Sequence, residues 1–411
     1  MSVRKRSWLA PNGETRSSWV VDYIDGQGKR RLKTFRLKKE ADAFAATASV
    51  EVREGTHTAD SQSVTVEKAA RFWLASAEAA GLERTTVDSY RSHIDHHIKP
   101  FIGPVKLNTL NVPVVRAFED QLREGGRSPA MVRKVLVSLG SLLSDAQERG
   151  LTARNVVRDI RGRRKNGERR QERRQKGRLK IGSDIPTREE VKALVGALEG
   201  RWRPLLLTAI FTGLRASELR GLPWSAVNFD KREIRVHQRA DRFNKIGPPK
   251  SETSERTVPA PPIVISALRE WKMTCPRRPS GKVDRDGNPI LVLDLVFPNG
   301  AGRVEQLNNI VRRGLQRAEV AAGITVETDE LDDEGNPVLA AKYPGLHALR
   351  HFYASWCINR REAGGLGLPP KVVQERMGHS TITMTMDVYG HLFPRGDDAD
   401  ELAAAENALL G

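Results

Sequence analysis

Residues from about Trp8 to His57 alternate between apolar and polar positions in the manner of β-strands. The segments 18–24 (SWVVDYI) and 30–35 (RRLKTF) flank the turn sequence 25–28 (DGQG), and this order predicts an antiparallel hairpin. An alanine-rich stretch over 38–52 follows and predicts one helix. We therefore expect a small β+α module over residues 1–60.

Apolar residues recur with helical spacing through residues 64–160. One amphipathic helix is expected over 66–80, a second from 85–90 behind a Thr cap, and a third from Pro129. The sequence 100–103 (PFIG) interrupts the pattern and predicts a break. The third helix has apolar residues at Val132, Val135, Leu136, Leu139, Leu142 and Leu143. Periodicity alone predicts an all-helical domain here, without separating one kind of helical unit from another.

A run of like charges follows the helical region. It includes Arg163, Arg164, Lys165, Arg169, Arg170, Arg173, Arg174, Lys176 and Lys180, opposed only by Glu168 and Glu172. No apolar residue recurs with any period before Leu179, so residues 161–186 are expected to be a linker. Such a run is either solvated or follows a phosphate backbone, and the sequence leaves both interpretations open.

Residues 187–395 read as a mixed α+β domain. Thr187 and Glu190 form a capping box at the start of one helix, and a second helix is expected from Pro204 to Gly213. Strands are expected at 233–237 and 256–259, inserted hairpins with turns at 286–289 and 333–337, and a helix over 371–377 ended by Gly378. The tail 396–411 is acidic and then alanine-rich, which fits a short helix. The fold class is therefore multidomain and mainly α.

Composition favours a polyanionic partner. The formal net charge is +17 with a pI near 10.1, and an aromatic content of 6% favours duplex phosphates over stacked single-stranded bases. Cys275 and Cys357 are far apart and lack metal-ligand spacing, so no structural disulfide is expected. No signal peptide or membrane span is evident, and we expect a soluble, intracellular protein.

Three short motifs carry residues suited to phosphodiester chemistry. They are 211–219 (FTGLRASEL), 347–351 (HALRH) and 378–391 (GHSTITMTMDVYGH). A phenol can attack phosphorus, two guanidiniums can clamp the non-bridging oxygens, and imidazoles can assist. Taken singly, Arg215 would be a surface residue paired with Glu218, and Tyr389 a structural tyrosine at a helix end.

A metal site is the competing interpretation of the histidines. No carboxylate or thiol stands at ligand spacing beside His347, His351 or His379. The separate cluster of His93, His96 and His97 has no companion motif, so a DNA-facing or solvated helix explains it better. We therefore expect neither a metal nor another cofactor.

Together, in this order, the motifs resemble those of the tyrosine recombinase (phage integrase) family. The resemblance implies six catalytic residues: Arg215, Lys250, His347, Arg350, His379 and Tyr389. Lys250 lies in 249–259 (PKSETSERTVP), where Ser251 replaces the more common Thr, and Lys245 competes with it on position. His351 is interpreted as a neighbour that orients the site.

The resemblance also implies a function and partners. We expect site-specific integration and excision of phage or mobile-element DNA through a 3′-phosphotyrosyl intermediate, without metal or ATP. The implied domains are an arm-type DNA-binding module (1–60), a SAM-like core-binding domain (64–160) and a catalytic domain (187–395). The implied partners are double-stranded DNA at attachment sites, three further copies in a homotetramer, and an excisionase or DNA-bending protein. The expected location is the bacterial cytoplasm, at the nucleoid.

Three other functions share part of this pattern. A type IB topoisomerase shares the nucleophile chemistry, but the N-terminal module and short tail favour a recombinase. A chromosome-dimer resolvase of the Xer type usually lacks that module. A DNA-binding regulator without catalysis would have no reason to hold Arg215, Arg350, His379 and Tyr389 together.

Overall fold

The computed structural model of the chain describes residues 1–26, 28–54, 63–163, 178–249, 251–394 and 399–410. The chain divides into two compact units, Met1–Gln175 and Lys176–Gly411. The first unit contains two separate hydrophobic clusters, and the second unit contains one large cluster.

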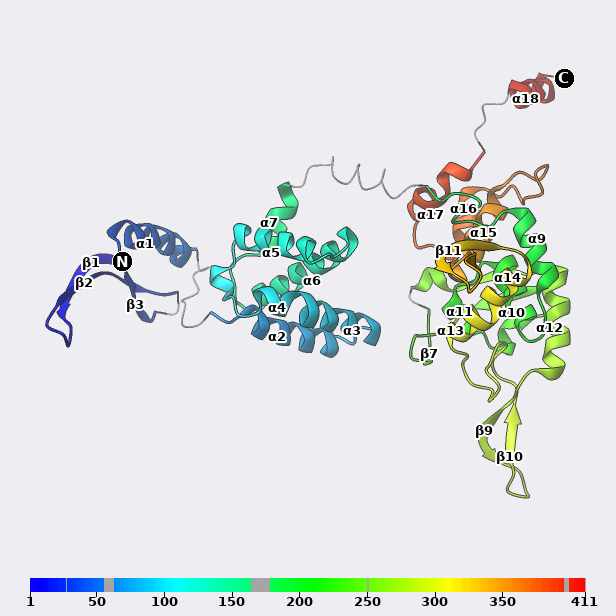
Figure 1. The fold of residues 1–411 in the computed structure, drawn as a ribbon, viewed down its shortest axis with the longest axis horizontal. Helices are drawn as coiled ribbons and strands as arrows, with labels where there is room; N and C mark the ends of the chain where they lie inside the picture. Colours follow the sequence, from blue (N-terminus) through cyan, green and yellow to red (C-terminus); the bar gives the residue numbers. More distant parts are fainter. Residues whose placement is uncertain (27, 55–62, 164–177, 250, 395–398, 411) are drawn as a thin grey trace. The chain divides into compact units, whose positions relative to one another are not determined.

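The N-terminal part of the first unit is an antiparallel sheet with one helix packed on it. The strands β1 (Ser2–Leu9), β2 (Thr15–Ile24) and β3 (Arg30–Phe35) lie in that order, and α1 (Lys38–Arg53) contacts them (Figure 1). The predicted hairpin and helix are confirmed. Strand β1 was not predicted. Its side chains are almost all exposed, so its sequence shows no alternation of apolar and polar residues.

The rest of the first unit is helical, as expected. Its α-helices are α2 (Val66–Ala79), α3 (Arg84–His93), α4 (Lys99–Ile102), α5 (Val112–Glu124), α6 (Pro129–Glu148) and α7 (Val156–Arg163). Helix α6 contacts α2, α3, α5 and α7, and all its predicted apolar positions are buried. The Ser128 side chain caps α6 by accepting from the backbone N–H of Met131 (3.3 Å).

Two boundary predictions in this region are wrong. Helix α3 begins at Arg84 with Glu83 at the cap position, so no Thr side chain caps it. The expected break at 100–103 is a helical turn, because a π-helical segment (Ile94–Ile98) runs into α4. Pro100, which lacks a backbone N–H, follows the π-helical segment within one continuous helical run, and that run ends two residues later at Ile102.

The basic linker falls largely on residues 164–177, which lie outside the described residues together with Arg169, Arg170, Arg173, Arg174 and Lys176. Helix α7 extends to Arg163, so the described helical region reaches into the range expected to be linker. The interpretation of this run as a phosphate-binding segment stays a prediction, as do the other domain boundaries.

The second unit mixes helices with short strands. Its main helices are α9 (Arg188–Ala197), α10 (Trp202–Thr212), α11 (Ala216–Arg220), α12 (Pro262–Thr274), α13 (Leu307–Asn309), α14 (Gln316–Ala321), α15 (His347–Ile358), α16 (Pro370–Met377), α17 (Ile382–Tyr389) and α18 (Ala399–Leu410). One sheet has the order β4-β5-β8 (Val227–Asn228, Glu233–Val236, Arg256–Pro259), and β6 (Arg239–Ala240) pairs with β7 (Ile246–Gly247). The capping box at Thr187 and the helix in the tail are confirmed.

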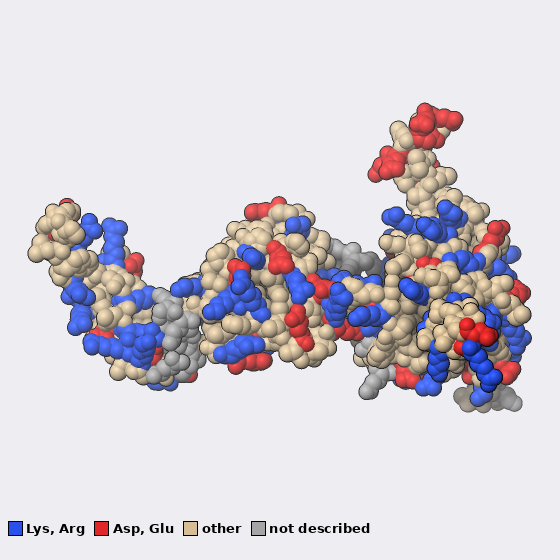
Figure 2. Space-filling view, turned by 90° about the horizontal axis from the view of Figure 1, so that it is seen from below, with Lys and Arg blue, Asp and Glu red and all other residues tan. Residues whose placement is uncertain are grey.

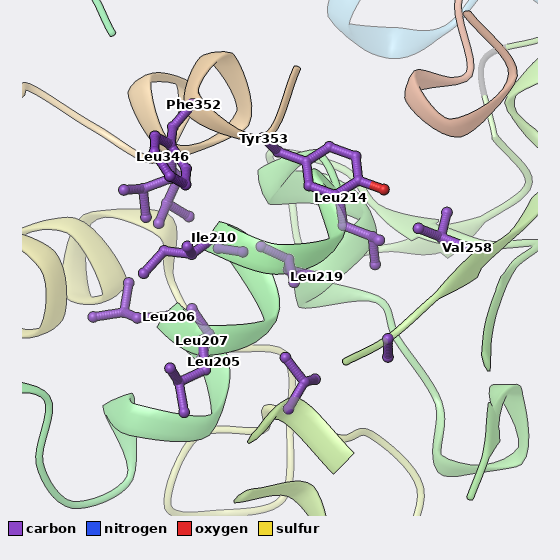
Figure 3. Close-up of a cluster of buried hydrophobic side chains, with 14 of the residues drawn as sticks. Leu205, Leu206, Leu207, Ile210, Leu214, Leu219, Val258, Leu346, Phe352 and Tyr353 are labelled. Atoms are coloured by element: carbon purple, nitrogen blue, oxygen red, sulfur yellow. The ribbon is translucent and has the colours of Figure 1, made fainter. Parts of the chain in front are cut away.

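Helix α10 is the centre of the second unit. Leu205, Leu206 and Leu207 are consecutive and all buried, so this helix is covered on every side. It packs between α12 and α15, and Figure 3 shows its leucines and Ile210 within one apolar cluster. The ends of α10 and of its neighbours are therefore held in fixed positions.

Two hairpins form at the expected turns. Strand β9 (Arg278–Val283) pairs with β10 (Pro289–Val292), and this hairpin projects from the unit in Figure 1. Strand β11 (Thr325–Leu331) pairs with β12 (Pro337–Ala341). Among the described residues, no helix is long and apolar enough to cross a membrane.

We predict that Gly213→Ala destabilises the second unit, whereas Gly196→Ala does not. Gly213 has φ of 62°, and a Cβ there would lie 2.2 Å from Tyr353 Cδ1. The loss in free energy of unfolding should reach about 2 kcal/mol or more. Gly196 lies in α9 with open space around it, so alanine there should add roughly 0.5 kcal/mol. Denaturant unfolding measures both, and equal effects would contradict the prediction.

Candidate active site

Arg215 is held at the start of α11. Gly213 ends α10 in the left-handed conformation, and Arg215 then occupies the N-cap position of α11. Glu218 accepts hydrogen bonds from the backbone N–H of Arg215 (2.8 Å) and from its Nη1 (2.7 Å). The ion pair expected between these two residues is confirmed.

Both arginines bind carbonyl groups at the C-terminal ends of helices. Arg350 donates to the carbonyl of Gly213 at the end of α10 and to that of Met377 at the end of α16. Arg215 Nη2 donates to the carbonyl of Gly378 (2.8 Å). Such carbonyls lack partners within their helices and carry the negative end of the helix dipole. Two helix ends therefore hold two cations close to one another.

Arg350 is almost completely buried, with 3% of its surface exposed. Burial and the nearby charge of Arg215 lower its pKa to about 9, while Glu218 opposes this shift. The guanidinium stays charged at neutral pH. A buried cation of this kind stabilises an anion strongly because little water screens it.

Glu218 is a buried carboxylate between two guanidiniums. Arg256, which precedes the apolar end of β8, donates to both oxygens of Glu218 (3.1 and 2.8 Å) and to the carbonyl of Arg376 (2.8 Å). Burial alone would raise the pKa of Glu218, but the hydrogen bond and charge of Arg256 and the charge of Arg215 lower it to about 2. Because Arg256 neutralises this carboxylate, the charge of Arg215 remains available to a ligand.

Three of the four motif histidines, His347, His351 and His379, are linked to the tyrosine directly or through one another. His347 is the first residue of α15 and is exposed, and His351 lies one turn further along that helix. Their rings meet edge to face at 4.5 Å. His379 follows the left-handed cap that was expected at Gly378, and its side chain is buried. Its Nδ1 lies 2.9 Å from Thr385 Oγ1.

Tyr389 is the last residue of α17, and 2% of its surface is exposed. Its hydroxyl lies 2.7 Å from His351 Nδ1, and its ring is parallel to that of His379 (6°) at 6.2 Å between centroids. Burial raises the pKa of Tyr389 to about 12, against the lowering effect of Arg350 and Arg215. The free protein therefore holds a neutral phenol beside two cations.

The described geometry does not decide which of the two candidate lysines is the general acid. Lys250 lies outside the described residues. Lys245 lies in the turn between β6 and β7, where its backbone N–H donates to Asp241 (2.9 Å). The assignment of Lys250 as general acid stays a prediction.

The part of the chain that the structure describes contains no group of three or more His, Cys, Asp or Glu residues arranged to hold a metal ion. In the separate histidine cluster, His93 Nδ1 lies 2.8 Å from Ser138 Oγ, and His97 is buried. Two of these rings therefore belong to the packing of the helical region, while His96 is exposed.

The structure adds weight to two residues that sequence reasoning treated lightly. In the sequence Arg256 is only one residue of the segment 249–259, and its contact with Glu218 joins positions 38 residues apart. His351 was interpreted as an orienting neighbour, and it touches the hydroxyl of Tyr389. Spacing along one helix places His351 near His347 and Arg350, but the contact with α17 depends on tertiary packing.

Comparison with known proteins assigns the site to a family. Residues 186–395 match the family described as "Phage integrase family". The "Tyrosine recombinase XerC-like" protein of Caldanaerobacter subterraneus subsp. tengcongensis is 27% identical, with 90% of each chain covered. The "ICEBs1 integrase" of Bacillus subtilis is 22% identical, with 96% of each chain covered.

Solved structures with the same fold are more distant in sequence. The Tn1549 transposon integrase in complex with transposon right end DNA has a TM-score of 0.58 at 18% identity, covering 85% of this chain and 100% of that chain. A lambda integrase tetramer bound to a Holliday junction has a TM-score of 0.51 at 16% identity, covering 92% of this chain and 96% of that chain. At this identity the likeness concerns the fold.

We predict that Glu218→Gln lowers stability in a pH-dependent manner. The folded pKa of Glu218, about 2, lies below its ordinary value of 4.5, so its stabilising contribution is present above about pH 4.5 and is lost as the pH falls toward 2. This lowering of the pKa from 4.5 to about 2 corresponds to roughly 3 kcal/mol in the free energy of unfolding at neutral pH.

Denaturant unfolding at several pH values tests this. The deficit of Glu218→Gln should be constant from about pH 7 to pH 5 and should shrink below that range. The exposed Glu199→Gln serves as the matched control and should leave stability unchanged within about 0.5 kcal/mol. A deficit that grows on acidification would refute the assignment.

Proposed function

This chain belongs to the phage integrase family, so it cuts and rejoins DNA as a site-specific tyrosine recombinase, and on that premise we propose that Tyr389 is its nucleophile. The observation that carries this proposal is the placement of Tyr389 beside Arg215 and Arg350. The two arginines bind the backbone of the segment 377–378, and Tyr389 follows that segment on the next helix. Cations, loop and phenol thus form one connected arrangement.

The arginines have donors to spare for a phosphate. A guanidinium carries five N–H donors, and the described hydrogen bonds of Arg215 and Arg350 use two side-chain nitrogens in each case. The remaining donors would bind the non-bridging oxygens of a phosphodiester. We assign to His347 and His379 the role of further donors to the phosphorane that forms during attack.

This arrangement supports the following reaction. Tyr389 attacks a phosphodiester, a 3′-phosphotyrosyl bond forms, and the 5′-oxygen leaves with a proton from Lys250. The 5′-hydroxyl of a partner strand then attacks the phosphotyrosyl bond and releases Tyr389. Bond energy is conserved through both steps, so the exchange of strands needs no ATP.

The substrate we propose is double-stranded DNA at the attachment sites of a mobile element. The net charge of +17 supports a polyanionic partner, and Figure 2 shows Lys and Arg side chains spread over the face in view. Relatives named as integrases support a mobile element, and "ICEBs1 integrase" covers nearly the whole chain. The lambda integrase tetramer on a Holliday junction supports assembly as a homotetramer. The N-terminal sheet would bind arm-type sites, and an excisionase or DNA-bending protein would set direction.

We predict that Tyr389→Phe abolishes strand cleavage and leaves DNA affinity nearly unchanged, because only the nucleophilic oxygen is lost. Nicked suicide duplexes that tile the DNA flanking the gene should give a covalent protein–DNA adduct with the wild-type chain and none with the variant. Tyr90→Phe, which keeps its ring stacked on Trp73 (4.3 Å), is the matched control and should cleave normally. An adduct with Tyr389→Phe would place the nucleophile elsewhere.

We predict that a 5′-bridging phosphorothiolate rescues Lys250→Ala. The sulfur leaves as a thiolate and needs no general acid, whereas on ordinary DNA the variant should lose at least about a hundredfold in cleavage rate. Lys245→Ala should cleave both substrates at the wild-type rate. The opposite result, with rescue confined to Lys245→Ala, would assign the acid to Lys245.

A further inference from the structure

The hydroxyl of Tyr389 has one hydrogen-bond partner among the described residues. That partner is Nδ1 of His351, at 2.7 Å. The two rings stand edge to face, with centroids 5.7 Å apart and planes at 62°, so the imidazole nitrogen points at the phenolic oxygen. His351 is partly buried on α15, and Tyr389 is buried at the end of α17.

We propose that His351 is the general base that accepts the phenolic proton of Tyr389 during strand cleavage. This inference rests on the proposed function, in which Tyr389 is the nucleophile. As the phenolic oxygen bonds to phosphorus, its proton passes to His351 Nδ1, while the bond from phosphorus to the 5′-oxygen breaks. In the rejoining step the 5′-hydroxyl attacks phosphorus and gives its proton to Lys250, the bond from phosphorus to Tyr389 breaks, and the proton on His351 returns to the phenolic oxygen.

The other basic groups of the site are less suited to this transfer. His379 has its Nδ1 engaged by Thr385 (2.9 Å), and its ring lies parallel to that of Tyr389. His347 meets the ring of His351, and no described hydrogen bond joins it to the hydroxyl. Arg215 and Arg350 are cations and cannot accept a proton.

The surroundings of His351 keep its imidazole neutral, so that it can accept a proton. Burial, followed by the charges of His347 and Arg350, lowers its pKa to about 4, and Asp184 opposes this shift. The ring is therefore neutral at neutral pH, and in the tautomer that carries its proton on Nε2, Nδ1 accepts the hydrogen bond of the hydroxyl. A bound phosphodiester adds negative charge beside the ring, and the phosphorane adds more. This field stabilises the imidazolium that proton transfer creates.

The same hydrogen bond has a competing explanation. His351 could hold Tyr389 in a resting position that must be broken before attack. The two explanations predict opposite effects of removing the imidazole. If His351 is the base, the variant cleaves more slowly. If His351 only holds Tyr389 in a resting position, the variant cleaves at the wild-type rate or faster.

Single-turnover formation of the covalent adduct on the nicked suicide duplex, between about pH 6 and pH 9, tests the proposal. The wild-type rate should be nearly independent of pH, because the base form of His351 is complete above about pH 5. His351→Phe should be at least about a hundredfold slower at pH 7. Its rate should rise about tenfold per pH unit, because attack then requires the ionised phenol.

Two further variants separate proton transfer from packing. His351→Ala opens space beside the hydroxyl, so added imidazole should restore part of its rate. His351→Gln can retain a hydrogen bond without basicity, and it should show the same steep pH dependence as His351→Phe. His96→Phe removes an exposed histidine of the helical region and should keep the flat wild-type profile. Duplex affinity, measured for each variant, reports on folding.

The outcomes are distinct. Variants of His351 that cleave at the wild-type rate or faster, with a flat pH profile, would overturn the proposal and establish the resting contact. Slow variants with a flat profile and no rescue by imidazole would also overturn it, because loss of packing alone explains them. A wild-type chain that forms no adduct with any tiled duplex would overturn the proposed function itself, and this inference with it.

Discussion

The site depends on one buried carboxylate, that of Glu218, held between Arg215 and Arg256. Its hydrogen bonds join α11 to the residue that begins β8, and Arg256 extends the connection to the carbonyl of Arg376 near the end of α16. Glu218 is almost fully buried, so the loss of either guanidinium would leave a charge without adequate compensation. The arrangement fixes three segments that are distant in sequence. Arg256 is the second cation beside Glu218, so the carboxylate does not cancel the charge of Arg215.

Helix ends supply the second constraint. Gly213 and Gly378 both adopt the left-handed conformation, which ends α10 and α16 abruptly and exposes carbonyl groups. Arg350 and Arg215 bind those carbonyls, so the helix dipoles offset the repulsion between two cations. Arg256 lies against Gly378, where a Cβ would come within 2.9 Å of its Nη1. Glycine at this position is therefore required both by the backbone and by the ion-pair network.

The nucleophile illustrates how burial and charge oppose one another. Burial makes ionisation of Tyr389 harder, and the arginines only partly offset that effect. A phenol that stays protonated in the free protein is protected from premature reaction. Attack then requires both the charge of a bound phosphate and a group that removes the proton. His351 occupies the position from which that removal is geometrically direct.

The sequence by itself determined the order of the elements and the identity of most of the site. Periodicity located the helix around Leu139, and Pro204 and Gly213 marked the two ends of the next one considered. Gly378 marked the end of α16, because glycine readily adopts the left-handed conformation that ends a helix. The break predicted at Pro100 is wrong, because a π-helical segment (Ile94–Ile98) continues the helix into that residue. Strand β1 was missed because its exposed side chains show no apolar period. Tertiary structure alone decided that Arg256 neutralises Glu218 and that His351, on α15, meets Tyr389, on α17. Such contacts join residues that no local spacing relates, because they are set by how whole helices pack around α10.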